Sequence, residues 1–151
     1  RAGSPLAASA IHFVPAPSAG KCLPALDRPP APIDPNFPGA ARLLPAPDCN
    51  FHFFSIKPGA YPLLDSGWWW SPPHIHFSIL GRSWMDRFVT QIFFPGEPLN
   101  ETDLLLNAVR DSEVRERLIF QFEGTSMGEV NAMCFRRDFV MRGHRRTTQR
   151  A

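Results

Sequence analysis

The sequence predicts a mainly β protein, an antiparallel β-sandwich with long proline-rich loops and one or two short helices. Three observations lead to this fold class. Of 17 prolines in 151 residues, 11 lie in residues 1–50. Short runs rich in aromatic and β-branched residues then follow one another, separated by turn signals such as Pro-Gly and Asp-Ser-Gly. Only one stretch shows apolar residues at helical spacing.

The first 50 residues are expected to form irregular, extended loop. Proline fixes one backbone angle and removes an amide donor, which excludes regular helix and central strand. The apolar run at 10–14 is the one candidate strand there. We expect a single domain over 1–151, with a proline-rich segment (1–50) and a strand-rich core (51–151). Because the chain begins with Arg1 rather than Met, we also expect it to lack an upstream segment.

The strand-rich core contains four candidate strands. They are FHFFSI (51–56), HIHFSIL (74–80), RFVTQIFF (87–94) and AMCFRRDFVM (132–141). Several short strands separated by turns are typical of an antiparallel sandwich or barrel.

One helical segment is expected between these strands. Asn100 is a candidate cap, and apolar residues repeat at helical spacing over 104–109. The run SEVRERL (112–118) can add a further turn or two.

Composition excludes several classes of protein. A net charge of +2 is too small to indicate a nucleic-acid partner, and the basic C-terminal end reads as a solvated tail. No apolar run approaches the roughly 18 residues of a membrane span. Three cysteines, Cys22, Cys49 and Cys134, are an odd number without CxxC spacing. Reduced thiols in the cytoplasm fit this pattern best.

The clearest chemical signal is a His-x-His pair. Strand alternation places His74, His76 and Ser78 on one face of the strand, so that the two imidazoles can bind one metal ion. The alternative is a polar face that happens to carry two histidines. Tyr61, the only tyrosine, lies shortly before the pair. A phenolate oxygen together with imidazoles suits Fe(III), although Tyr61 can also be an ordinary turn residue.

These residues resemble a known family. KPGAYP, WWWSPPHIHFSI and TQIFFPGEPLN are similar to segments of the intradiol ring-cleavage dioxygenases, and the resemblance extends roughly over residues 20–147. It implies a β-sandwich with a non-haem Fe(III) held by two tyrosines and two histidines. It places one tyrosine at Tyr61, the histidines at His74 and His76, and a substrate-pocket glutamine at Gln91. Tyr61 and Gln91 are therefore the expected catalytic residues.

The resemblance also implies a reaction and partners. Protocatechuate or a related catechol would be cleaved by O2 between its hydroxyl-bearing carbons to a cis,cis-muconate, in aromatic compound catabolism. The chain would assemble with a homologous α- or β-type chain in an oligomer. The tryptophans at 68–70 are interpreted as core and interface residues rather than as a substrate cage.

Two positions depart from the family pattern. Cys22 stands where the family has its second ligating tyrosine, and Ser71 stands where it has an active-site arginine. Cys22 can be an iron ligand or an unliganded thiol. An alternative function is therefore a non-catalytic structural subunit, or degenerate homologue, that keeps the fold and possibly the iron. A third hypothesis, a cupin-like Fe(II) site, requires another ligand near the pair, and Asp65 is the close candidate.

Overall fold

The computed structural model describes residues 10–15, 36, 39–62, 69–81, 87–127, 131–141 and 147–148. Its largest sheet is antiparallel, with the strand order β2-β1-β5-β6. These strands are β1 (Ala10–Pro15), β2 (Ala41–Leu43), β5 (His74–Leu80) and β6 (Arg87–Phe93). Two hairpins accompany it, β3–β4 (Tyr61–Pro62 and Trp70–Ser71) and β7–β8 (Gln121–Met127 and Asn131–Arg136). The expected mainly β, antiparallel fold is confirmed.

The central strands β5 and β6 divide the sheet into two chemically different faces. On one face His76 lies opposite Gln91, and on the other Ile75 lies opposite Ile92. Side chains alternate along a strand, so that Ile75, Phe77 and Ile79 share the apolar face. All three are at most 4% exposed. The alternation expected for 74–80 is therefore present.

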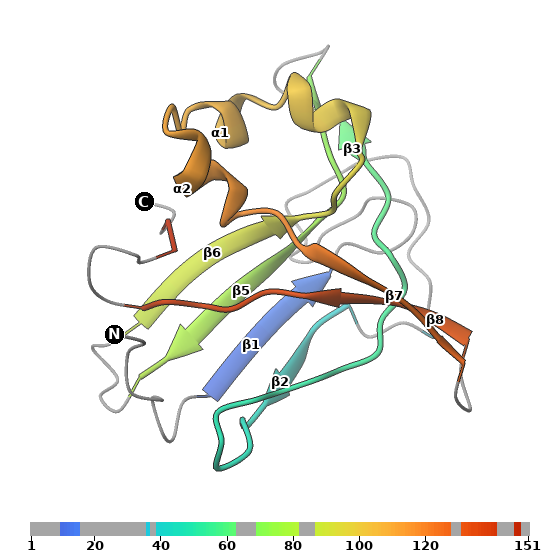
Figure 1. Cartoon of the computed structure of the whole chain (residues 1–151), viewed down its shortest axis with the longest axis vertical. Helices are drawn as coiled ribbons and strands as arrows, with labels where there is room; N and C mark the ends of the chain where they lie inside the picture. Colours follow the sequence, from blue (N-terminus) through green and yellow to red (C-terminus); the bar gives the residue numbers. More distant parts are fainter. Residues whose placement is uncertain are drawn as a thin grey trace.

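The core lies between this apolar face and the segments that pack over it. Figure 1 shows the β7–β8 hairpin crossing in front of the four-stranded sheet. Phe77, at 1% exposure, is the centre of this core. Its ring lies within 6.4 Å, between centroids, of four other rings. These rings belong to Phe51, Phe53, Phe120 and Phe139.

Short helices cover the end of the sheet where β5 begins and β6 ends (Figure 1). They are the 3₁₀ helix η1 (Pro98–Glu101), α1 (Leu104–Asn107) and α2 (Ser112–Glu116). Asp103 caps α1 through a hydrogen bond from the Leu106 amide to its side chain. The expected cap, Asn100, is wrong, because Asn100 lies within η1 and donates to the Phe94 carbonyl.

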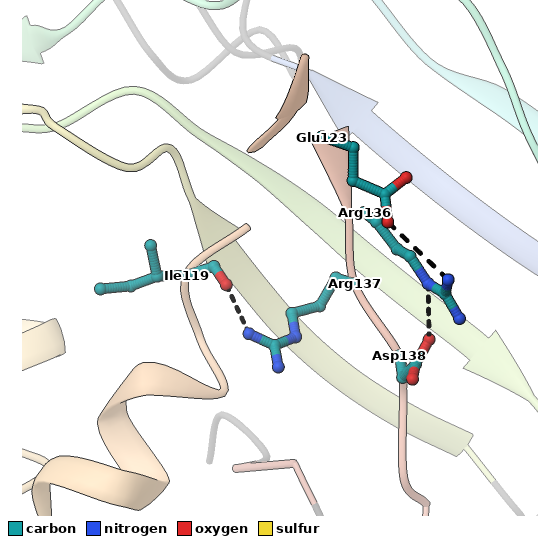
Figure 2. A network of polar contacts seen from close by, with 5 residues as sticks. All are labelled: Ile119, Glu123, Arg136, Arg137 and Asp138. Atoms are coloured by element: carbon teal, nitrogen blue, oxygen red, sulfur yellow. Dashed lines mark hydrogen bonds and ion pairs between the residues drawn. The ribbon is translucent and has the colours of Figure 1, made fainter. Parts of the chain in front are cut away.

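Arg137 ties the segment after β8 to the segment after α2. Its Nη1 donates to the carbonyls of Glu116 and Ile119, at 2.9 and 2.6 Å, and Figure 2 shows the bond to Ile119. Burial lowers the pKa of Arg137 below its ordinary value. Ile119 in turn forms a parallel bridge with Phe93, the last residue of β6. These two hydrogen bonds of Arg137, called here the Arg137 clamp, therefore hold the segment that pairs with the end of β6 facing the helices.

Two strand predictions need correction. Residues 51–56 are not a strand, because Phe51 and Phe53 pack into the core without their backbone joining a ladder. The predicted strand 132–141 is paired only over β8 and continues as irregular chain. The strands β2, β3, β4 and β7 are not among the predicted strands. Predicted strands at 10–14, 74–80 and 87–94 are confirmed by β1, β5 and β6.

Two further observations bear on the composition. No helix among the described residues is long and apolar enough to cross a membrane. Cys49 and Cys134 are free thiols. Cys22 lies outside the described residues.

Candidate metal centre

His74 occupies a rigid position at the first residue of β5. Two prolines precede it, where missing amide donors do not interrupt the ladder. The His74 side chain is 2% exposed, and its Nδ1 lies 2.7 Å from the Pro72 carbonyl oxygen. A carbonyl can only accept, so Nδ1 carries the proton and Nε2 presents a lone pair. Backbone geometry before the strand thus sets which nitrogen can bind a metal.

His76 brings a second imidazole to the same point. The Nε2 atoms of His74 and His76 are 3.0 Å apart, and the ring centroids are 4.7 Å apart. Both side chains project from the polar face of β5, because residues two apart in a strand point to the same side. The two imidazoles thus lie close together on one face of β5.

The β3–β4 hairpin carries Tyr61 to the histidines. Tyr61 lies directly opposite Ser71 in the hairpin. The Ser71 hydroxyl is 3.4 Å from Nδ1 of His74, and the Tyr61 ring centroid is 5.8 Å from that of His74. One side of this hairpin, which carries Tyr61 and Ser71, thus lies against His74.

Residues of β6 complete the neighbourhood. Gln91, 6% exposed, lies opposite His76, so that its side chain shares the polar face. Phe93 lies opposite His74, with ring centroids 5.4 Å apart, and is fully buried. The structure therefore brings together all four site residues expected from the sequence, Tyr61, His74, His76 and Gln91.

Other expected participants cannot be placed. Cys22 and Asp65 both lie outside the described residues. Within the described ranges, no group of three or more histidine, cysteine or carboxylate side chains gathers in a way that could hold a metal. Of the described residues expected as ligands, Tyr61 is the one whose ring lies beside the histidine pair.

A large hollow lies elsewhere, on the opposite face of the sheet. It measures about 1290 Å³ and is lined by core residues such as Ile75, Phe77 and Phe139. None of Tyr61, His74, His76 and Gln91 lines it. The converging nitrogen atoms of His74 and His76 therefore lie apart from this hollow.

Comparison with known proteins decides the family. The family model described as "Dioxygenase" matches residues 1–143. The chain belongs to the intradiol dioxygenase family. The protocatechuate 3,4-dioxygenase beta chain of Burkholderia cepacia is 37% identical over 141 residues, which are 93% of this chain and 60% of that relative. The chain thus spans 60% of the length of the curated relative it matches.

The sequence did not indicate two contributors to the geometry around His74 in this intradiol dioxygenase family member. They are the Pro72 carbonyl and the Phe93 ring. The Pro-Pro-His run predicts the start of a strand, but it does not predict the hydrogen bond from the His74 imidazole to the Pro72 carbonyl. Both strands are predicted from the sequence, but their register is not. The position of Phe93 opposite His74 follows only once that register is known.

Proposed function

We propose that this chain forms a non-haem Fe(III) site of the intradiol dioxygenase type, with Tyr61, His74 and His76 as ligands. The observation that carries the proposal is the convergence of two imidazole Nε2 atoms at 3.0 Å beside the only tyrosine of the chain. Membership of the dioxygenase family supports it.

The residues fit such an ion. Two nitrogens bound at about 2.0–2.1 Å and about 90° apart lie roughly 2.9 Å from each other. The observed separation of 3.0 Å agrees with this. The bond from His74 Nδ1 to the Pro72 carbonyl is the outer contact that commonly orients a ligating imidazole. A hard phenolate oxygen with imidazoles favours Fe(III) over softer ions.

The proposed reaction is the O2-dependent cleavage of protocatechuate or a related catechol between its hydroxyl-bearing carbons, giving a cis,cis-muconate. When bound, ferric iron would supply a Lewis acid that draws electron density from the catechol ring. Tyr61 and the two histidines would hold it. Gln91 lies on the same polar face, where its amide can hydrogen-bond and orient the catechol. Phe93 excludes water beside His74.

Assembly with a homologous α- or β-type chain is part of the proposal. The relative is itself named a beta chain. Large apolar side chains are exposed on this chain, including Leu44 at 80% and Phe54 at 74%. Exposed apolar groups of this size suit contact with another polypeptide.

The free thiols Cys49 and Cys134 suit a reducing cytoplasm.

The decisive experiment is a visible spectrum of iron-loaded protein. A ferric tyrosinate absorbs visible light, and Tyr61 is the only tyrosine, so the band can have no other phenolate source within the chain. Tyr61→Phe should remove the band. His12→Gln, which changes a histidine on the same sheet that contacts Arg42 instead, should retain it. A colourless wild-type protein with stoichiometric iron would refute the ligand assignment.

A second candidate function, a non-catalytic subunit, is favoured by Ser71. This residue is 2% exposed beside His74, at the position where the resemblance implies an arginine. A serine hydroxyl offers a neutral hydrogen bond and no positive charge, and loss of a preorganised charge partner typically costs about 10²-fold in rate or more. Oxygen uptake with protocatechuate separates the two candidates. A coloured protein that consumes no oxygen, alone or with its partner chain, would be a non-catalytic subunit.

A further inference from the structure

Tyr61 is carried by a very short hairpin. Its strand β3 pairs with β4 at two positions, Tyr61 opposite Ser71 and Pro62 opposite Trp70. Pro62 has no amide donor to add to this ladder. Even a longer two-stranded hairpin is only marginally stable by itself. A stable position for the Tyr61 ring beside the histidines therefore needs contacts outside the ladder.

Lys57, four residues before Tyr61, makes contacts of this kind. Its Nζ forms an ion pair with Glu97, which immediately precedes η1. The same Nζ lies 5.6 Å from the centre of the Phe94 ring, and an ammonium within about 6 Å of an aromatic ring is attracted to its face. The Glu97 side chain is 20% exposed and Phe94 is buried, so both contacts are partly shielded from water. One cation thus binds two groups that follow β6.

The contact with Phe94 connects this anchor to the histidine strand. Phe94 directly follows β6, and its amide donates to the Pro73 carbonyl, at 3.2 Å, where β5 is about to begin. The chain between Lys57 and Tyr61 is short, and it contains the buried Pro58, whose ring fixes one backbone angle. A short, stiff link therefore joins Tyr61 to an anchor that is itself hydrogen-bonded to the entry of β5.

We propose that Lys57 is a positioning residue, which holds Tyr61 beside the histidine pair through its contacts with Glu97 and Phe94. This inference rests on the proposed function, in which Tyr61 is a ligand of ferric iron. A phenol that is already fixed beside the imidazoles loses little conformational freedom when it binds the ion, and a preorganised ligand binds more tightly. Loss of the Lys57 charge would leave the imidazoles in place, because both histidines belong to β5 itself.

The first test compares binding of Fe(III) with binding of Zn(II), because imidazoles and water can bind zinc without a phenolate. Lys57→Met removes the charge and keeps an unbranched side chain of similar length. It should weaken Fe(III) binding roughly threefold to thirtyfold, through loss of an ion pair and a cation–π contact, and leave Zn(II) binding within about twofold. Competition with a chelator measures both affinities.

Two further variants make this test specific. Lys57→Arg retains the charge and can also stack on the Phe94 ring, so it should restore Fe(III) binding. Arg136→Met removes the cation of another ion pair, with Glu123 and Asp138, and should leave both metal affinities unchanged.

The second test needs no metal. Tyr61 is the only tyrosine, so protein labelled at tyrosine gives one set of ring signals in its NMR spectrum. In metal-free wild type these signals should show a through-space contact with the ring of His74, since the two centroids are 5.8 Å apart. Lys57→Met should weaken that contact, whereas Lys57→Arg and Arg136→Met should keep it.

The outcomes separate this inference from the proposed function. Equal weakening of Fe(III) and Zn(II) binding by Lys57→Met would indicate a general loss of structure and would overturn the inference. An unchanged contact between the Tyr61 and His74 rings in Lys57→Met would also overturn it. Iron-loaded wild type without the visible band would refute the proposed function, and the metal-free spectra would still decide whether Lys57 holds Tyr61.

Discussion

Replacement of Phe77 tests the assignment of faces on which the site depends. Phe77 is 1% exposed and contacts four phenylalanine rings, the nearest with centroids 4.8 Å away. Truncation of a buried phenylalanine to alanine costs about 3–5 kcal/mol. Because the other rings cannot close over the gap without losing their own contacts, we expect Phe77→Ala to fall in the upper half of that range. Ser78→Ala, one residue away on the polar face, should cost at most about 1 kcal/mol, since the bond that Ser78 accepts from Arg87 is exposed.

The assay is urea unfolding followed by tryptophan fluorescence. A domain of this size has a total stability of about 5–15 kcal/mol. The loss expected for Phe77→Ala is a large part of that total, so Phe77→Leu provides a milder variant with the same direction. A slip of one residue in the register of β5 would reverse the two faces. A severe loss for Ser78→Ala together with a mild loss for Phe77→Leu would show that reversal, and the histidines would then lie on the core face, no longer opposite Gln91 as in this register.

Two further changes test the end of the sheet near the histidines. Asp103→Ala should destabilise the protein by about 1–2 kcal/mol through loss of the bond to the Leu106 amide, whereas Asp103→Asn should retain most of it; urea midpoints measure both. An alanine variant as stable as wild type would contradict the capping role. Arg137→Met should cost about 1–2 kcal/mol, because it removes the bonds to the carbonyls of Glu116 and Ile119, while Arg136→Met at an exposed position should change the thermal midpoint little. Equal thermal midpoints for Arg137→Met and Arg136→Met would show that the hydrogen bonds of Arg137 do not stabilise the protein.

The predicted parts of the fold are those in which local signals agree with tertiary packing. For 74–80, the Pro-Pro entry, the β-branched residues and the alternation of polar and apolar residues all favour a strand ending near Leu80. The same alternation gave the common face of His74 and His76. The 3.0 Å between their Nε2 atoms depends in addition on the orientation of the side chains, which strand alternation does not give.

The failures have a different cause. FHFFSI (51–56) has strong strand propensity, but strand formation needs a partner backbone, and partners are decided by long-range topology. Conversely, β7 contains Gly124 and polar residues that weaken its local signal, and its pairing with β8 maintains it despite a bulge near Gly124. Asn100 and Asp103 are both good caps, and the choice between them depends on the turn formed by η1.

In the proposed ferric site, iron binding and turnover would be separable properties. Tyr61, His74 and His76 come from one hairpin and the strand that follows it, so a few short-range contacts suffice to bring them together. Ser71 lies within that same segment and would lower the positive charge beside the proposed ligands without displacing them, since it still approaches His74. A chain can therefore retain a coloured ferric site after losing the group that stabilises developing negative charge. The spectrum then reports the ligands, and only oxygen consumption reports the reaction.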